Sequence, residues 1–187
     1  MDEYIDVATQ DGKLTGKREL KSVIHKKGLY HHTAHVWLYT RDKQILLAQR
    51  SAKKNICPLL WDVSVAGHID AGETPKQAAV RETAEEIGLH ILEEDLDLIG
   101  IYKCFQTYDN GLIDNEFHNT FIAELKVETS LLKLQNTEVE AVKLISFKNF
   151  ENLITNIGQN NHFIASNKAY YQTVYKNIVS KTHTTLL

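Results

Sequence analysis

The chain has 187 residues, of which 43% are hydrophobic and 24% charged, and its formal net charge is −3. This length and this apolar share predict a single domain, residues 1–187, with a proper hydrophobic core. The negative charge indicates no affinity for a nucleic acid polymer, whose phosphate backbone requires a basic surface. Two cysteines are too few for a disulfide framework, and neither a signal peptide nor an apolar run of membrane-spanning length is visible. We therefore expect a cytoplasmic protein that does not enter a membrane.

Strand-like segments dominate the chain, and helical periodicity is confined to the middle and the C-terminal end. Strands are expected at 3–7, 17–20, 35–39, 44–49, 61–66, 98–107, 116–125 and 139–145, and helices at 74–87, 147–157 and 168–179. Residues 1–30 form an N-terminal β extension, and residues 147–187 contain the C-terminal helices. Strands around a central helix, with further helices at the end, predict a mixed sheet covered on both faces.

The central helix has recognisable ends and an apolar side. Thr74 is a possible cap or first-turn residue, Pro75 is tolerated in a first turn, and Gly88 stands where a left-handed terminator is expected. Four residues at helical spacing are expected to face the core: Val80, Thr83, Ala84 and Ile87.

Three carboxylates of this helix are spaced to share its other side. Glu82 lies three residues before Glu85 and four before Glu86, so all three project from one face. Clustered carboxylates repel one another unless a cation neutralises them, and oxygen ligands favour a hard ion, Mg²⁺ or Mn²⁺, that bridges to substrate phosphates. The alternative is a solvated acidic helix face, which is what such a pattern usually means when it stands alone.

The loop before the helix favours the metal site. Five residues separate Gly67 from Glu73, and seven more lead to Arg81 and Glu82. A bidentate ion pair between Glu73 and Arg81 is expected to tie the loop to the helix. The segment GHIDAGETPKQAAVRETAEEIGL resembles the Nudix box, G-x5-E-x7-R-E-U-x-E-E-x-G-U with U apolar, and departs from it only at Thr83.

The resemblance implies an α/β fold, a Nudix-type α/β/α sandwich with a mixed β-sheet and the Nudix loop-helix. It also implies metal-dependent hydrolysis of a diphosphate linkage in a small molecule, such as a nucleoside diphosphate derivative, by attack of water. Residue by residue, Glu82 and Glu86 match the principal metal ligands, Glu85 a further ligand, and the backbone near Gly67 completes the site.

Residues other than the principal metal ligands are candidates for the general base and for substrate binding. The general base in such enzymes is often a glutamate outside the box, for which Glu116 is the first candidate and Glu85 the second. Arg50 and Lys54 precede the box and are expected to meet the diphosphate, unless they form a solvated turn. His68, inside the box loop, is expected near the site.

A second resemblance extends over about residues 3–125. The segments HKKGLYHHTAHVWLY and LLAQRSAKKNICPLLWDVSVAGH are similar to isopentenyl-diphosphate isomerase, a Nudix-fold enzyme that holds its metal with histidines and glutamates. His25, His32, His68 and the segment 114–116 lie at similar positions. The essential cysteine of the isomerase precedes its Gly-His pair, where this chain has Ala66. Because the thiol is missing and the box carboxylates are present, hydrolysis is favoured over isomerisation.

Some choices stay open at this point. His31 and His35 are interpreted as structural histidines near a strand, whereas His25 and His32 are equally compatible with a metal or phosphate site. An isomerase-like enzyme with another acid and a non-catalytic Nudix ligand sensor are the alternatives to a hydrolase. The sequence does not identify the diphosphate, and a homodimer is possible because dimers are frequent among relatives.

Overall fold

The computed structural model describes residues 3–184, with Thr184 placed by its backbone only. Nine strands and four α-helices are present among these residues. Their bounds are β1 (Tyr4–Ala8), β2 (Leu14–Leu20), α1 (Lys21–Lys27), β3 (Tyr30–Tyr39), β4 (Gln44–Arg50), β5 (Trp61–Asp62), β6 (Val65–His68), α2 (Pro75–Ile87), β7 (Asp97–Thr107), β8 (Ile113–Glu124), β9 (Val139–Ser146), α3 (Phe147–Thr155) and α4 (Lys168–Thr184). Within residues 3–184, no helix is both long and apolar enough to cross a membrane.

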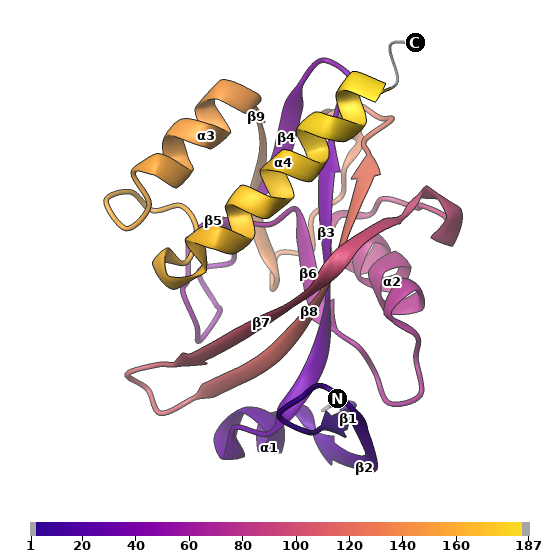
Figure 1. Cartoon of the computed structure of the whole chain (residues 1–187), viewed down its shortest axis with the longest axis vertical. Coiled ribbons are helices and arrows are strands. Elements are labelled where there is room, and N and C mark those ends of the chain that lie inside the picture. The colour runs from indigo at the N-terminus through magenta and orange to yellow at the C-terminus, as the bar shows by residue number, and fades with distance from the viewer. Residues whose placement is uncertain (1–2, 185–187) are drawn as a thin grey trace.

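The elements form three layers, with α2 on one face of a mixed sheet and α3 and α4 on the other (Figure 1). One apolar cluster fills the space between the sheet and α2, and it includes Val36, Leu46 and Ile87. A second cluster, with Trp37, Phe150 and Tyr171, lies under α3 and α4. The expected α/β/α sandwich is therefore confirmed.

Strand β3 is the centre of the sheet. It runs parallel to β8, with His31 opposite Glu116 and Thr33 opposite His118, and antiparallel to β6, with Thr33 opposite His68. Because side chains alternate along a strand, the even-numbered residues of β3 face α2 and the odd-numbered ones face α4. This parity decides which histidines can reach the functional site.

Helix α2 forms as its sequence predicts. The Thr74 side chain accepts a hydrogen bond from Gln77 N, and the Gln77 side chain accepts one from Thr74 N, so the cap is a reciprocal capping box. Gly88 ends the helix with φ +67°. Thr83, the one departure from the box, is buried, and its hydroxyl donates to Ala79 O at 2.6 Å within the helix. The core therefore accepts a threonine there without an unpaired polar group.

The sequence missed one short helix, and one expected strand is wrong. Helix α1 was not predicted, since seven residues with only Ile24 buried carry no periodic signal. The expected strand at 61–66 is two strands, because β5 pairs with β4 whereas β6 pairs with β3. Between them the Ser64 hydroxyl accepts from Leu38 N and donates to Leu46 O, so a side chain replaces the backbone ladder where the chain changes partners.

Candidate active site

The box loop and helix α2 bring carboxylates against strand β6. A Cβ atom on Gly67 would lie 1.9 Å from Glu82 Cδ, so only glycine allows Glu82 to approach this strand. One residue earlier, Ala66 N donates to Glu86 Oε2 at 3.3 Å. Close packing of the helix on β6 therefore depends on the first glycine of the box.

Arg81 holds the loop and the helix together. Its Nε and Nη2 atoms donate to the two oxygens of Glu73 at 3.0 and 2.8 Å, which is the expected bidentate ion pair. Nη1 donates to Glu82 Oε1 at 2.9 Å and to Glu85 Oε2 at 3.2 Å, while Nη2 also donates to His68 O at 3.0 Å. The guanidinium thus orients the carboxylates and is itself fully engaged.

The carboxylates are only partly neutralised by the protein. Burial raises the pKa of Glu82, and burial together with the Glu82 charge raises the pKa of Glu86 to about 8. Lys54 and Arg50 oppose the shift at Glu86 without cancelling it. A site of crowded, buried carboxylate oxygens with too little positive charge fits a hard divalent cation.

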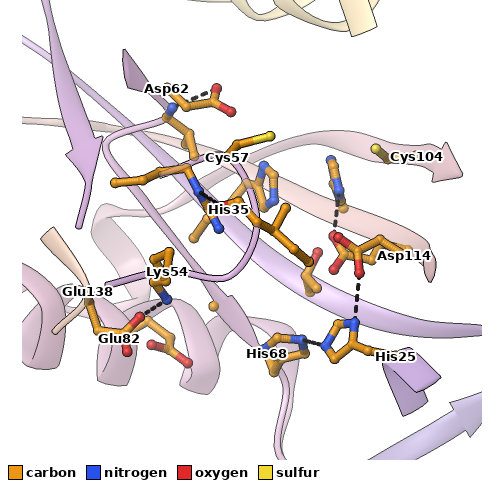
Figure 2. Close-up of a pocket in the computed structure, with 18 of the residues that line it drawn as sticks. His25, His35, Lys54, Cys57, Asp62, His68, Glu82, Cys104, Asp114 and Glu138 are labelled. Atoms are coloured by element: carbon orange, nitrogen blue, oxygen red, sulfur yellow. Dashed lines mark hydrogen bonds and ion pairs between the residues drawn. The ribbon is translucent and has the colours of Figure 1, made fainter. Parts of the chain in front are cut away.

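These carboxylates form one wall of a cavity of about 800 Å³ (Figure 2). We call Glu82, Glu85 and Glu86 the carboxylate wall. Arg50, Lys54 and Glu138 line the cavity beside it. Lys54 points toward Glu138 and is ion-paired with it, and the Nε of Arg50 donates to Ile56 O at 3.0 Å.

A group of imidazoles lies at the cavity, where His25, His68 and Glu116 line it and His31 is buried behind them. The ligand atoms of four residues all lie within 4.8 Å of one another, and we call these residues the histidine cluster: His25, His31, His68 and Glu116. They come from four elements, namely α1, β3, β6 and β8. Figure 2 shows His25 between His68 and Asp114. The distance from His25 Nε2 to His68 Nε2 is 3.0 Å, and that from His25 Nδ1 to Asp114 Oδ1 is 2.7 Å.

In the rings of His25 and His31, the Nδ1 atom faces an acceptor. The Nε2 atom of each ring is therefore left with a lone pair. His25 Nδ1 faces the Asp114 carboxylate, and His31 Nδ1 lies 3.0 Å from Leu29 O. Each Nδ1 must therefore carry the proton of a neutral ring, and each Nε2 faces inward. His31 Nε2 is buried 3.5 Å from Glu116 Oε1 and has no hydrogen-bond partner in the described part of the chain. This is the arrangement of histidines that bind a metal, each oriented by an acceptor behind the ring.

The charges in this part of the cavity fit the same interpretation. Burial lowers the pKa of His68 well below its ordinary value, so the ring is neutral. Burial acts to raise the pKa of Glu116, but its hydrogen bond with His118 and the nearby His31 ring hold it well below its ordinary value. Imidazole nitrogens together with one carboxylate are a ligand set for a divalent transition metal.

A family model described as the NUDIX domain matches residues 29–166. The chain belongs to the Nudix family. It is 34% identical over 159 residues to Nudix hydrolase 3 of Arabidopsis thaliana, covering 82% of this chain and 20% of that protein. It is also 32% identical over 151 residues to an isopentenyl-diphosphate Delta-isomerase of Salmonella heidelberg, covering 79% of each. The chain thus spans about a fifth of the plant relative's length. Both resemblances seen in the sequence are confirmed.

Solved structures agree on the Nudix fold. A crystal structure of DR0079 from Deinococcus radiodurans superposes with a TM-score of 0.68 at 16% identity, covering 91% of this chain and 98% of that one. A MutT protein from Methanosarcina mazei gives 0.61 at 17% identity, covering 79% and 95%. At these identities the likeness concerns the fold alone.

Most residues expected at the Nudix site do meet in one cavity. Arg50, Lys54, Gly67, His68, Glu116 and the carboxylate wall line it, whereas Glu73 and Arg81 stand behind the wall. Their roles in catalysis and binding remain predictions. Glu85 has a side chain that is 60% exposed, so it lies at the open end of the wall.

The structure separates the histidines that the sequence left open. His25 joins the cluster, but His32 faces the other side of β3, where it contacts Gly12 O at 2.8 Å and the Asn119 side chain at 3.0 Å. The odd-numbered neighbour, His31, joins the cluster instead of His32. His31 was interpreted as structural because the sequence alone did not show the parity of β3.

Three further groups in the cavity were missed. His118 contacts Glu116, with His118 Nε2 2.9 Å from Glu116 Oε2, and its spacing of two residues along β8 could have indicated a shared face. Cys57 and Cys104 also line the cavity, although neither stands at position 66. No short-range sequence signal connects these two thiols to the site.

Proposed function

We propose that this Nudix protein is a divalent-metal-dependent hydrolase that cleaves the diphosphate linkage of a small molecule. The observation that supports this most is the convergence of the carboxylate wall, Arg50 and Lys54 on one cavity. Carboxylates recruit the metal, and the two cations compensate the charge of a diphosphate.

Mg²⁺ is the metal proposed for the carboxylate wall, with Mn²⁺ as a substitute, because all side-chain ligands offered there are oxygens. Glu82 and Glu86 are the principal ligands, Glu85 a further one, and the backbone at Gly67 lies beside them. When bound, the ion polarises phosphoryl oxygens and activates water. Glu73 and Arg81 hold the ligands in place.

The choice of general base changes when the contacts of Glu116 are considered. Its two oxygens face His31 and His118, and its pKa is held well below the ordinary value, which makes it a weak base. We therefore assign Glu116 to the histidine cluster, where it binds a divalent ion other than the Mg²⁺ of the carboxylate wall. Glu85, at the open end of the carboxylate wall, is the preferred base.

A panel of diphosphates tests this function. The full chain is incubated with nucleoside diphosphate derivatives, thiamine-type diphosphates and isoprenoid diphosphates in the presence of Mg²⁺ or Mn²⁺, and release of phosphate or monophosphate is measured. Metal-dependent hydrolysis of at least one class is the expected result. Hydrolysis that persists in the chelator-treated protein would contradict the proposal.

The second candidate is an isomerase-like activity. It is favoured by the histidine cluster and by isomerases that are 32% identical to this chain. Against it, position 66 is alanine, although Cys57 and Cys104 bring thiols into the cavity from other elements. Incubation with isopentenyl diphosphate separates the two: double-bond migration supports the isomerase, and monophosphate release supports the hydrolase. Ligand binding without turnover under any metal would instead indicate a sensor.

Other properties remain predictions from the sequence. We expect a single Nudix domain over residues 1–187, a cytoplasmic location, no binding of nucleic acid polymers and possible homodimers. Size-exclusion chromatography with light scattering tests the last of these.

A further inference from the structure

A pair of stacked histidines lies directly beside the histidine cluster. The ring centroids of His35 and His118 are 3.8 Å apart with an interplanar angle of 24°, and their ligand atoms and that of Glu116 lie within 4.8 Å of one another. His118 Nε2 is 2.9 Å from Glu116 Oε2, whereas His31 Nε2 is 3.5 Å from the other oxygen, Oε1. The Glu116 carboxylate therefore stands between two sets of imidazoles, with one oxygen toward each.

The His35 ring has a polar partner from helix α4. His35 Nδ1 lies 3.0 Å from the Tyr170 hydroxyl, whose oxygen accepts from Trp37 Nε1 at 2.9 Å. The Cys104 sulfur, which accepts from Asn167 Nδ2 at 3.0 Å, lines the cavity together with His118. Polar partners such as Tyr170 hold metal-binding imidazoles in position.

Two buried polar atoms on the same face of β3 have no hydrogen-bond partner among residues 3–184. They are His31 Nε2 and Thr33 Oγ1. Thr33 lies opposite His118 in the β3–β8 register, and it lines the cavity. Because an unpaired buried polar group is costly, two of them at successive positions on this face of β3, opposite Glu116 and His118, point to an ion and its water ligands.

We propose that Glu116 bridges two transition-metal ions in this cavity. The first ion belongs to the histidine cluster, and the second is held by His35, His118 and the Oε2 atom of Glu116. The imidazole-rich ligand set suits Zn²⁺, Mn²⁺, Fe²⁺ or Co²⁺ rather than Mg²⁺. With only three protein ligands, the second ion keeps open positions that face the cavity and accept oxygens of an anionic substrate.

The ion in the histidine cluster is part of the proposed function, and the inference rests on that function for this ion alone. The ion held by His35 and His118 is independent of it. The carboxylate wall has its own, oxygen-only metal site, so the two kinds of site are separable by ion type. Bridged two-metal centres hold their ions about 3.5–4 Å apart, which couples the spins of two Mn²⁺ ions. Coupling gives a readout that does not depend on catalysis.

The experiment counts the ions and measures their coupling. Metal-free full chain carrying Glu82→Gln and Glu86→Gln is titrated with Mn²⁺, and electron paramagnetic resonance spectra are recorded. The expected result is two ions per chain and an exchange-coupled multiline spectrum. The unsubstituted chain in excess Mg²⁺, which occupies the carboxylate wall, is expected to give the same result.

Variants assign the second ion to its ligands. His35→Gln and His118→Gln are each expected to reduce the count from two ions to one and to replace the coupled spectrum with the six lines of isolated Mn²⁺. His32→Gln is the matched control, since this histidine lies on the same strand but faces the other side. It is expected to retain both ions and the coupling.

A count of one uncoupled ion in the unsubstituted chain overturns the proposal, and so does a second ion that survives both His35→Gln and His118→Gln. The unsubstituted spectrum decides the matter even if a variant does not fold, as circular dichroism would reveal. If no diphosphate is hydrolysed but the coupled pair is present, the proposed function fails and this inference stands.

Discussion

The carboxylate wall and three members of the histidine cluster, His25, His68 and Glu116, line one cavity, yet the chain builds the wall and the cluster in different ways. The carboxylate wall comes from one continuous segment, in which Gly67, Arg81 and the spacing of α2 bring the ligands together. The histidine cluster needs four elements and the parallel register of β3 and β8. The comparison shows that a site made by a local motif can be inferred from spacing, whereas a site made by strand parity requires the sheet.

The largest effect is expected from removing charge in the carboxylate wall. Glu82→Gln and Glu86→Gln are each expected to lower kcat by about 10²–10³-fold, because the Mg²⁺ that activates water loses a principal ligand. Steady-state rates of diphosphate hydrolysis measure this.

Glu94 provides the control, because it is also a glutamate but is exposed and lies outside the cavity. Glu94→Gln should leave the rate unchanged. If Glu82→Gln and Glu86→Gln both retained full activity, the carboxylate wall would not be the catalytic metal site.

A substitution in the loop separates geometry from charge. Gly67→Ala places a Cβ atom 1.9 Å from Glu82 Cδ, so Glu82 must move away from β6. We expect an activity loss of roughly 10²-fold and a drop of about 1–3 kcal/mol in the free energy of unfolding from overpacking. Hydrolysis rates and urea denaturation measure the two effects.

Gly16→Ala is the matched glycine, because its φ is +77° and nothing lies within 4 Å of an added Cβ. It should cost about 1 kcal/mol through backbone strain alone and leave activity intact. Equal activity losses in both variants would show that the close approach of Glu82 is unimportant.

Two neighbouring histidines whose side chains face opposite sides of β3 test the histidine cluster. His31→Gln is expected to weaken Co²⁺ binding by about 10–100-fold, because it removes an inward-facing lone pair. His32→Gln should not alter it, since that ring bonds Gly12 O on the other face of the sheet. Titrations followed by the visible absorption of Co²⁺ distinguish the two, and the reverse order of effects would restore His32 as the ligand.

The smallest effect concerns pH. The pKa of Glu86 is raised to about 8, so a metal at the carboxylate wall must displace its proton at neutral pH. Mn²⁺ affinity is expected to rise up to about tenfold per pH unit between pH 6 and 8 and to level off above. Isothermal titration calorimetry on His31→Gln, in which the histidine cluster is weakened, measures the affinity of the carboxylate wall.

The stability of the metal-free protein is expected to change with pH in the opposite direction to the Mn²⁺ affinity. A raised carboxyl pKa contributes stability that is present at low pH and lost as pH rises through about 8, so metal-free protein should become less stable between about pH 5 and 8. In Glu86→Gln both this loss and the dependence of Mn²⁺ affinity on pH should be reduced. A pH-independent affinity in the unsubstituted chain would contradict the assignment.

Much of the fold was accessible from the sequence. Alternation and helical periodicity located the longer strands, α2 and the C-terminal helices, while α2 was further specified by Thr74, Pro75 and Gly88. The short helix α1 and the break at Ser64 were not accessible, because each is decided by contacts with distant strands.

By itself, the sequence determined the box and therefore the family and the carboxylate wall. The physical reason is that residues three and four apart on a helix must share a face, so local spacing is enough. Only the tertiary structure decided that His31 rather than His32 lies beside Glu116, and that His25, His35 and His118 surround the same carboxylate. Those relations depend on strand register and on which side of the sheet each parity faces, and long-range packing sets both.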